Sequence, residues 1–316
     1  MEKKFSIRYV KLHFTLRMLE DTELPLNKPS ALRGGMGEML LRANCIRDRD
    51  CENCDFESEC IVRRTMYSKM EIEPKFMSAG DSVGYVIECE DYRTDFNEGD
   101  ELKFNLILFG KTIVYFSQYM NAFYALGMNG LGKKHSKFVI SEVTNSRNRP
   151  LLRGSDIDMG EYQVSTLADY VSFRKKQIMN PNSGVAIPAL KLKLQSPLTM
   201  KYRGEYLQEL KPEALIEALY RRAYMLDCFE GIEAESKPPE EIRYPEITSQ
   251  NMKPVNVQRY SFRKNEKMNF SGIEGVAFIS DVTENVLDYL LAGELIHIGK
   301  NSSFGFGRFH ISKEGE

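Results

Sequence analysis

The order of predicted strands and helices repeats within the chain, and this repeat constrains the fold more than any other feature. In the first half, apolar periodicity predicts strands over 6–16, 82–90, 101–109 and 137–143, and helices over 38–44 and 112–126. In the second half it predicts strands over 189–195, 255–262, 268–279 and 304–311, and helices over 212–228 and from Thr283 to about Leu291. Each half therefore has the order strand–helix–strand–strand–helix–strand.

This repeated order indicates an internal duplication of a ferredoxin-like βαββαβ unit, and therefore an α+β fold. A chain of 316 residues has room for two such domains. We expect an N-terminal domain over 1–150, with a cysteine-rich insertion over 45–60. We expect a C-terminal domain over 160–316, with a glycine-rich loop over 299–308. Polar, proline- or glycine-rich segments over 145–160 and 232–254 are the predicted linkers.

Composition narrows the class of protein. No run of 18 apolar residues is present, so we expect no membrane span, and the first residues lack the pattern of a signal peptide. A cytoplasmic protein is therefore expected. The net charge of −2 argues against a bulk electrostatic binder of nucleic acid, but cations gather in 127–153 and 291–313. Such segregation leaves room for a local basic face; scattered, solvated charge is the alternative.

The segment 296–311 is the best candidate for ligand binding. It holds three glycines, two cationic side chains and two histidines, and it has no carboxylate. Glycine allows a backbone to approach a ligand and to turn its N–H groups outward, which we expect of Gly305 and Gly307. Lys300 and Arg308 would supply the positive charge that a phosphodiester attracts. Phe304 and Phe306 would either stack on bases or pack in the core.

Four of the six cysteines lie within sixteen residues, as Cys45, Cys51, Cys54 and Cys60, in the pattern C-x5-C-x2-C-x5-C. Disulfides are not expected in a reducing cytosol, whereas four thiols at this spacing suit tetrahedral coordination, most often of zinc. The polar residues around them cannot form an apolar core. We expect a structural zinc ion, with an iron–sulfur cluster or unligated thiols as alternatives.

Three segments carry a resemblance to a known family: Leu32-Arg-Gly-Gly-Met-Gly37 leading into the cysteines, Arg221-Arg222 late in a helix after Ser196-Pro-Leu-Thr199, and the stretch from Gly293 to Arg308. With the paired ferredoxin-like domains, they resemble the RAMP superfamily of CRISPR-associated proteins, and within it the endoribonucleases that process precursor crRNA. The resemblance implies an RNA-binding cleft between the domains and cleavage without a metal cofactor. It implies CRISPR repeat RNA or precursor crRNA as the ligand and effector-complex subunits as partners, with no DNA.

Cleavage without a metal uses the 2′-hydroxyl of the RNA as the nucleophile and leaves a 2′,3′-cyclic phosphate. The protein then has to transfer protons and stabilise a dianionic transition state. Histidine suits the first task near neutral pH, and lysine or arginine suits the second. We expect His297 or His135 to transfer the proton and Lys300 to hold the phosphate. An anchoring hydrogen bond that shapes the loop is the alternative role for His297, and simple exposure is the alternative for His135.

The remaining candidate RNA contacts are the cations near the other glycines, namely Arg33, Arg42, Lys133 and Lys134. The family often places a catalytic histidine in or near the first helix, but residues 27–44 contain none. Two other functions therefore stay open. One is a non-catalytic RNA-binding subunit of a CRISPR effector complex; the other is a zinc-stapled assembly protein whose basic loops meet an acidic partner.

Overall fold

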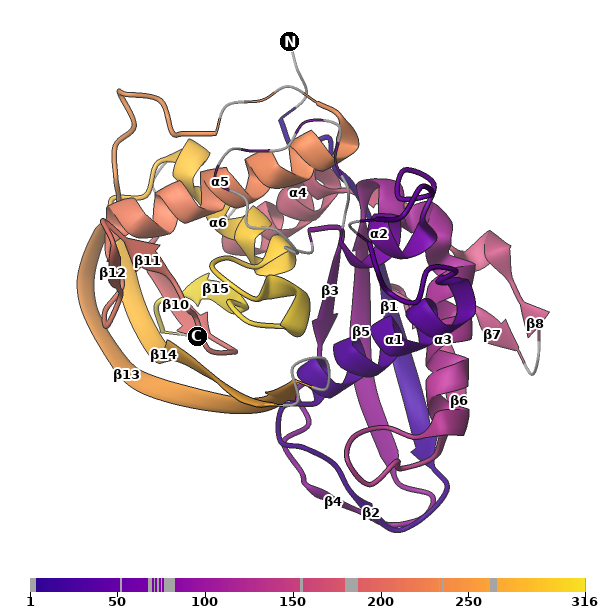
Figure 1. The fold of residues 1–316 in the computed structure, drawn as a ribbon. Coiled ribbons are helices and arrows are strands. Elements are labelled where there is room, and N and C mark those ends of the chain that lie inside the picture. The colour runs from indigo at the N-terminus through magenta and orange to yellow at the C-terminus, as the bar shows by residue number, and fades with distance from the viewer. Residues whose placement is uncertain are drawn as a thin grey trace. The chain divides into compact units, whose positions relative to one another are not determined.

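The computed structural model describes residues 4–67 except 52, the single residues 70, 72, 74 and 76, and 83–153, 156–179, 187–261 except 233 and 235, and 266–315, with the side chains of 153 and 258–269 left aside. It divides into two compact units (Figure 1). The first unit comprises residues 9–164 with 259–267, and the second comprises 1–8, 165–258 and 268–316. Among the described residues, no helix combines the length and the apolar character that crossing a membrane needs.

The first unit is built on an antiparallel sheet with the strand order β3-β5-β1-β6. Its strands are β1 (Arg8–Met18), β3 (Tyr85–Glu88), β5 (Glu101–Phe109) and β6 (Phe138–Asn145). Numbered within the unit, this order is 2-3-1-4, which is the order of a ferredoxin-like fold. The central strand β1 alternates buried and less buried residues, as its sequence pattern predicts.

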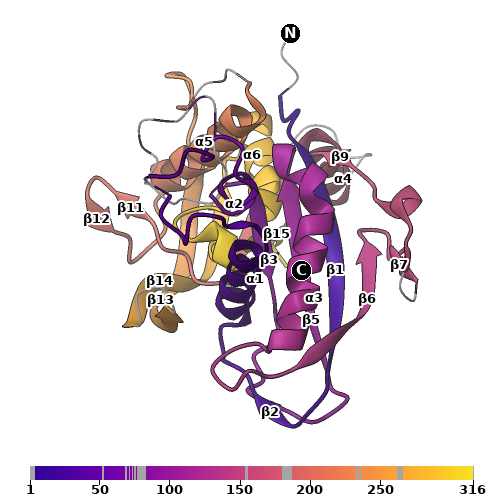
Figure 2. The ribbon, with the colours of Figure 1, turned by 45° about the vertical axis from the view of Figure 1, so that its right-hand side comes forward.

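Two helices, α1 (Lys28–Asn44) and α3 (Phe116–Asn129), cover one face of this sheet (Figures 1 and 2). The rings of Phe14 on β1 and Phe104 on β5 stack at 4.8 Å between centroids, and Phe123 of α3 lies 5.0 Å from Phe104. A 3₁₀ turn over Gly110–Tyr115 leads into α3, and the short helix α2 (Ile61–Met66) packs beside α1. Aromatic packing of this kind fixes the helix layer on the sheet.

The glycines near residue 35 lie inside a helix, contrary to the prediction of a loop there. Helix α1 begins at Lys28, ten residues before the predicted start. A Cβ on Gly35 would lie 2.5 Å from a methyl group of Leu126, and one on Gly37 would lie 2.6 Å from the methyl group of Met66. The glycines therefore allow α1 to approach α3 and α2 closely. Likewise Gly127 continues α3, which ends at Gly130 with φ of 93°.

The second unit repeats the same topology with the strand order β13-β14-β10-β15. Its strands are β10 (Leu190–Leu194), β13 (Glu246–Ser261), β14 (Glu266–Ser280) and β15 (Phe309–Lys313), and its helices are α4 (Leu167–Ile178), α5 (Pro212–Glu230) and α6 (Glu284–Ile296). Thr283 caps α6 by accepting a hydrogen bond from the Val286 N–H. The predicted α+β fold of two tandem ferredoxin-like domains is confirmed.

Two parts of the second unit differ from the predictions. Helix α4 was not expected; its start is a capping box in which Thr166 and Asp169 exchange hydrogen bonds, a signal that the sequence carries. Strand β13 begins within the predicted linker, nine residues before the expected start at Val255. It is the outermost strand of its sheet and includes Pro254.

The remaining elements are short. They are the antiparallel pair of β2 (Thr22–Glu23) with β4 (Asp95–Phe96), and the hairpins of β7 (Leu152–Arg153) with β8 (Asp156–Ile157) and of β11 (Lys201–Tyr202) with β12 (Glu205–Tyr206). The others are β9 (Ser165–Thr166) and 3₁₀ turns over Met159–Glu161 and Ser302–Phe304. The last of these turns occupies part of the predicted strand 304–311, which starts only at Phe309.

Candidate functional site

The glycine-rich loop joins α6 to β15 and is tied to the segment that follows β10. The Lys300 N–H donates to the Thr199 carbonyl at 2.8 Å, and the Gly307 N–H donates to the Pro197 carbonyl at 2.9 Å. Across the base of the loop, the Ile298 N–H donates to the Gly307 carbonyl at 3.1 Å. These bonds explain why the stretch Ser196-Pro-Leu-Thr199 accompanies the loop in the sequence. Backbone hydrogen bonds therefore hold the loop in one conformation against the segment that follows β10.

The structure corrects the expectation that Gly305 and Gly307 turn their N–H groups to a ligand. Both residues are buried, and their N–H groups donate to the carbonyls of Ser302 and Pro197. A Cβ on Gly307, where φ is 69°, would lie 1.7 Å from the Ile298 carbonyl oxygen. These glycines therefore give the loop its shape. Phe304 and Phe306 are buried too, as the core-packing alternative predicts.

His297 is the C-cap of α6 and is fully buried, with 0% of its surface exposed. Its Nδ1 atom lies 3.1 Å from the carbonyl oxygen of Phe306, across the loop. Beside it, Arg222 donates from Nε to the Ile296 carbonyl at the end of α6, at 2.9 Å. The geometry is that of the anchoring role, in which His297 holds the two ends of the loop together. A side chain in this position has no open path to a substrate.

Lys300 is the exposed cation of the loop, and it meets the β11–β12 hairpin. Its Nζ atom lies 5.5 Å from the centre of the Tyr206 ring, and Lys201 Nζ lies 4.5 Å from the same ring. Next to them, the Arg203 guanidinium lies 5.2 Å from the Tyr202 ring. We call these five residues the lysine–tyrosine surface. Three cations and two aromatic rings on one surface offer both charge for phosphates and faces for bases.

The hairpin that presents this surface has a tight turn. Arg203 and Gly204 both have positive φ, at 50° and 89°, which two-residue hairpin turns require. Tyr206 is half exposed, at 49%. This surface was not predicted, although the segment Lys201-Tyr-Arg-Gly-Glu-Tyr206 carries its signal, two cations interleaved with two aromatic residues around a turn. Arg308 lies at the other end of the loop, half-buried, with its N–H donating to Ser196 Oγ at 2.9 Å.

In the first unit, the loop after α3 carries the other basic candidates. Leu131 and Ser136 close this loop with paired backbone hydrogen bonds of 2.8 and 3.0 Å. Lys133 and His135 are exposed on it, and His135 has φ of 53°. Lys134 pairs with Glu23, at 2.9 Å between Nζ and Oε2. The loop therefore presents a histidine and a lysine to solvent.

The two arginines of α1 differ in setting. Arg42 is exposed, but its charge is offset by Glu38 one turn earlier, at 2.9 Å between Nε and Oε1. Arg49 also pairs with Glu38, at 2.6 Å. Arg33 is half-buried. Of the candidates in the first unit, Lys133 and His135 are thus better placed than Arg42 to meet an incoming anion.

A buried carboxylate, Glu294 of α6, ties three elements of the second unit together. It accepts hydrogen bonds from Arg174 Nε at 2.7 Å, from the Tyr170 hydroxyl at 3.1 Å and from the Ile311 N–H at 2.7 Å, and His310 Nδ1 lies 3.0 Å away. Burial by itself would raise the pKa of Glu294, but the hydrogen bonds from His310, Arg174 and Ile311 outweigh it and lower the pKa. Glu294 is therefore a charged tie between α4, α6 and β15.

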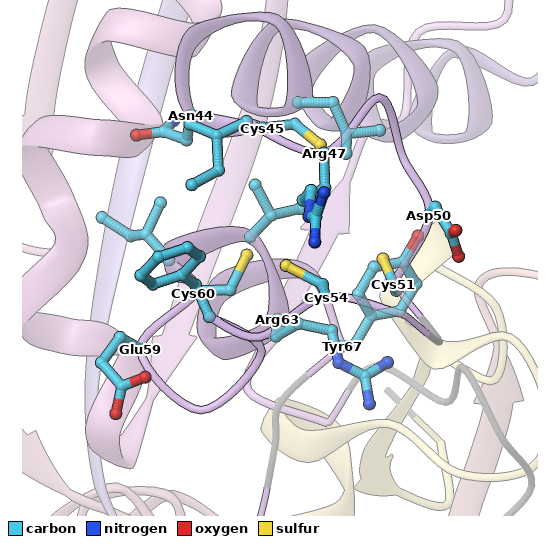
Figure 3. Close-up of a pocket in the computed structure, with 15 residues that line it drawn as sticks. Asn44, Cys45, Arg47, Asp50, Cys51, Cys54, Glu59, Cys60, Arg63 and Tyr67 are labelled. Atoms are coloured by element: carbon cyan, nitrogen blue, oxygen red, sulfur yellow. The ribbon is translucent and has the colours of Figure 1, made fainter.

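The four clustered cysteines line a cavity of about 290 Å³ in the first unit (Figure 3). All four are free thiols and partly buried, and burial raises the pKa of Cys51. Within the described part of the chain, no three His, Cys, Asp or Glu side chains are gathered closely enough to hold a metal ion as they stand. The structure thus brings the thiols to one cavity without assembling them around one point.

Comparison with family models assigns both halves of the chain. A model of an N-terminal domain, AF_1859_N, matches residues 7–165, which is half of the chain. The model of the CRISPR-associated endoribonuclease Cas6 matches residues 192–309 and so includes the glycine-rich loop. No curated protein matches the chain in sequence.

Solved structures with this fold include a Thermus thermophilus Cas6, at a TM-score of 0.50 and 10% identity over 97% of this chain and 99% of that one. A Cas6 product complex matches at 0.50 and 18% identity, over 97% of this chain and 100% of the other. A partial Cas6–RT–Cas1–Cas2 complex matches at 0.57 and 14% identity, over 98% of this chain. This chain spans only 47% of the chain in that complex and 29% of the one in the full complex.

At these identities the structural matches establish the fold, and the Cas6 family model covers the part of the chain that holds the glycine-rich loop. Residues 192–309 of the chain therefore match the model of the CRISPR-associated endoribonuclease Cas6, and the chain as a whole has the fold of the solved Cas6 structures.

Proposed function

We propose that this chain binds CRISPR repeat RNA and cleaves precursor crRNA without a metal ion. In the proposed reaction the 2′-hydroxyl attacks the adjacent phosphorus, the bond to the 5′-oxygen breaks, and the products carry a 2′,3′-cyclic phosphate and a 5′-hydroxyl. The observation that carries the proposal is the lysine–tyrosine surface, which lies at the exposed tip of the loop that the Cas6 family model includes.

The geometry of this surface supports binding of a phosphodiester. Two ammonium groups, of Lys201 and Lys300, lie within 5.5 Å of one ring centre, so the positive charge is concentrated at Tyr206. The backbone of Lys300 is held by Thr199, which fixes where that charge is presented. A preorganised cation stabilises the extra negative charge of the transition state more than a mobile one does. The exposed face of Tyr206 would stack on a neighbouring base.

We assign proton transfer to a different residue from those that bind the phosphate. The burial of His297 and its bond to Phe306 support a positioning role, in which it holds the loop that carries Lys300. His13 is bonded to Asn105 and His310 to Glu294. His135 is exposed, and among the four histidines it is the proposed proton-transfer residue.

A non-catalytic role has one observation in its favour. The segment 27–44 lacks a histidine, and the histidine beside the glycine-rich loop is buried. A chain that holds RNA without cutting it would serve as an RNA-binding subunit of a CRISPR effector complex. Relatives in complexes with Cas1 and Cas2 support other CRISPR proteins as partners in either case.

Incubation of the purified protein with end-labelled repeat RNA in excess chelator tests the proposal. We expect a product that ends in a cyclic phosphate, which resists phosphatase until acid opens the ring. Tight binding with intact RNA would support the non-catalytic subunit instead, and no binding at physiological salt would contradict both. Lys300→Ala and Lys201→Ala should each weaken binding and lower the salt slope by about one counterion. Lys176→Ala, an exposed lysine on α4, is the matched control and should change neither.

A further inference from the structure

We propose that Cys45, Cys51, Cys54 and Cys60 bind one zinc ion, which closes the cysteine insertion (residues 45–60) as a structural site. The ion would be held by four thiolates in a tetrahedral arrangement, the usual geometry of structural zinc. The site lies in the first unit and is independent of the lysine–tyrosine surface, which belongs to the second unit.

The burial pattern of the insertion is the first argument. Among its described residues between Cys45 and Cys60, none is buried, and Ile46 and Phe56 are 71% and 55% exposed. The cysteines are partly buried, whereas most of their neighbours are exposed. Ile46 and Phe56 line the cavity together with the thiols but stay largely exposed, so the segment has no buried hydrophobic core of its own. A loop of this composition needs a crosslink to hold one conformation.

The placement of the thiols is the second argument. Cys45 is the C-cap of α1 and Cys60 is the N-cap of α2, so two of the four are fixed by helices that pack in the core. Cys51 and Cys54 lie on the loop between them, with the two-residue spacing that lets neighbouring thiolates share a metal. All four line the same cavity, and Figure 3 shows the sulfur atoms of Cys54 and Cys60 directed toward each other.

Hydrogen-bond donors around the cavity are the third argument. The Arg49 N–H donates to Cys45 Sγ at 3.2 Å, an interaction that a zinc-bound thiolate strengthens. Arg63 lines the cavity, and its Nε is buried without a hydrogen-bond partner among the described residues. An orphaned buried donor beside four sulfurs indicates a missing acceptor. Four thiolates around Zn²⁺ carry a net charge of −2; Arg47 and Arg63 line the cavity beside them, and each is also ion-paired, Arg47 with Asp55 and Arg63 with Glu57.

The four sulfur atoms lie farther apart in this structure than they would around a zinc ion. Zinc–sulfur bonds of about 2.3 Å place the four sulfurs within about 4 Å of one another. The thiols as they stand are not gathered that closely. Binding of zinc would therefore contract the loop between α1 and α2 around the cavity. Metal binding and local order are coupled in such a site, because the ligands are brought together only when the ion is present.

The first experiment measures metal in the full chain purified under reducing conditions. We expect about one zinc per chain, and after exchange into cobalt(II) the absorption bands of tetrahedral thiolate coordination. Cys54→Ser and Cys60→Ser should lose the metal. Cys89→Ser and Cys228→Ser are matched controls and should keep it, because these cysteines lie outside the cavity. Burial raises the pKa of Cys89 to about 11, so it remains a thiol at neutral pH.

A second measurement guards against variants that fail to fold. Limited proteolysis of the unmodified chain should cleave within the cysteine insertion after zinc is removed by a strong chelator, and not before. Re-addition of zinc alone should restore protection. The proposal is overturned if the reduced protein neither contains nor takes up zinc, if it carries an iron–sulfur chromophore instead, or if Cys54→Ser and Cys60→Ser both retain full occupancy.

Discussion

At the scale of single residues, burial decides between two roles that the sequence allows for the same histidine. His297 lies two residues before Gly299 and three before Lys300, a setting that suits either an acid–base residue or a loop anchor. Its neighbours in the chain are the same in both cases. What the sequence does not give is the position of the Phe306 carbonyl, nine residues later, which turns back to accept a hydrogen bond from the ring.

Replacement of this histidine tests the anchoring role. His297→Ala should lower the free energy of unfolding by about 2 kcal/mol, because it leaves the buried Phe306 carbonyl without its partner. His135→Ala should change stability by less than about 0.5 kcal/mol and should slow cleavage by about 10²–10⁴-fold. Denaturant titration and single-turnover cleavage measure the two effects. If His297→Ala left the stability unchanged and greatly lowered the cleavage rate, His297 would be a proton-transfer residue and not an anchor.

At the scale of elements, apolar periodicity predicted most strands and helices correctly, and the glycines near residue 35 led to the wrong start for one helix. Strand β5 has the predicted bounds, and the helices α5 and α6 lie close to theirs. The error at α1 arose because Gly34, Gly35 and Gly37 suggest a loop when only sequence neighbours are considered. For Gly35 and Gly37 the reason is tertiary, since Leu126 of α3 and Met66 of α2 approach the helix at these two positions. Helix α4 was missed although its capping box was readable, because its apolar stripe is narrow.

The three glycines of α1 need not be equivalent. A Cβ at Gly34 would meet nothing within 4 Å, whereas one at Gly35 would collide with Leu126. Gly34→Ala should therefore stabilise the protein by about 0.5–1 kcal/mol, the difference in helix propensity. Gly35→Ala should destabilise it, because the packing cost exceeds that gain. Thermal unfolding of the pair checks both signs. Stabilisation by both substitutions would contradict close packing of α1 on α3.

At the scale of the whole molecule, the duplicated topology was the most predictable property and the functional surface the least. Two matching series of elements define two matching sheets, because strand order within a ferredoxin-like unit follows from connectivity. The lysine–tyrosine surface joins Lys300 to residues almost a hundred positions earlier. Nothing in the local pattern of either segment specifies that pairing, so it required the structure.

The acid stability of the fold should depend on Glu294. Its pKa in the folded state is lowered, so its contribution is complete above the unfolded pKa of about 4.3 and is lost as pH falls through the folded value. At pH 7, Glu294→Gln should cost about 3 kcal/mol, because it leaves Arg174 without its buried partner. The deficit should shrink below about pH 4. Glu240→Gln, at an exposed position, is the control for denaturant titrations across this range. A deficit independent of pH would contradict an ionised Glu294.

The outermost position of β13 affects how the protein behaves at high concentration. A sixteen-residue strand with one neighbour leaves a row of main-chain donors and acceptors unsatisfied, and such rows recruit strands from other molecules. Pro254 has no amide hydrogen to donate to the strand of another molecule, and the charge of Lys253 beside it repels a second copy of the chain. This pair of residues therefore helps to keep the chain from polymerising edge to edge, a protection that needs no covering helix.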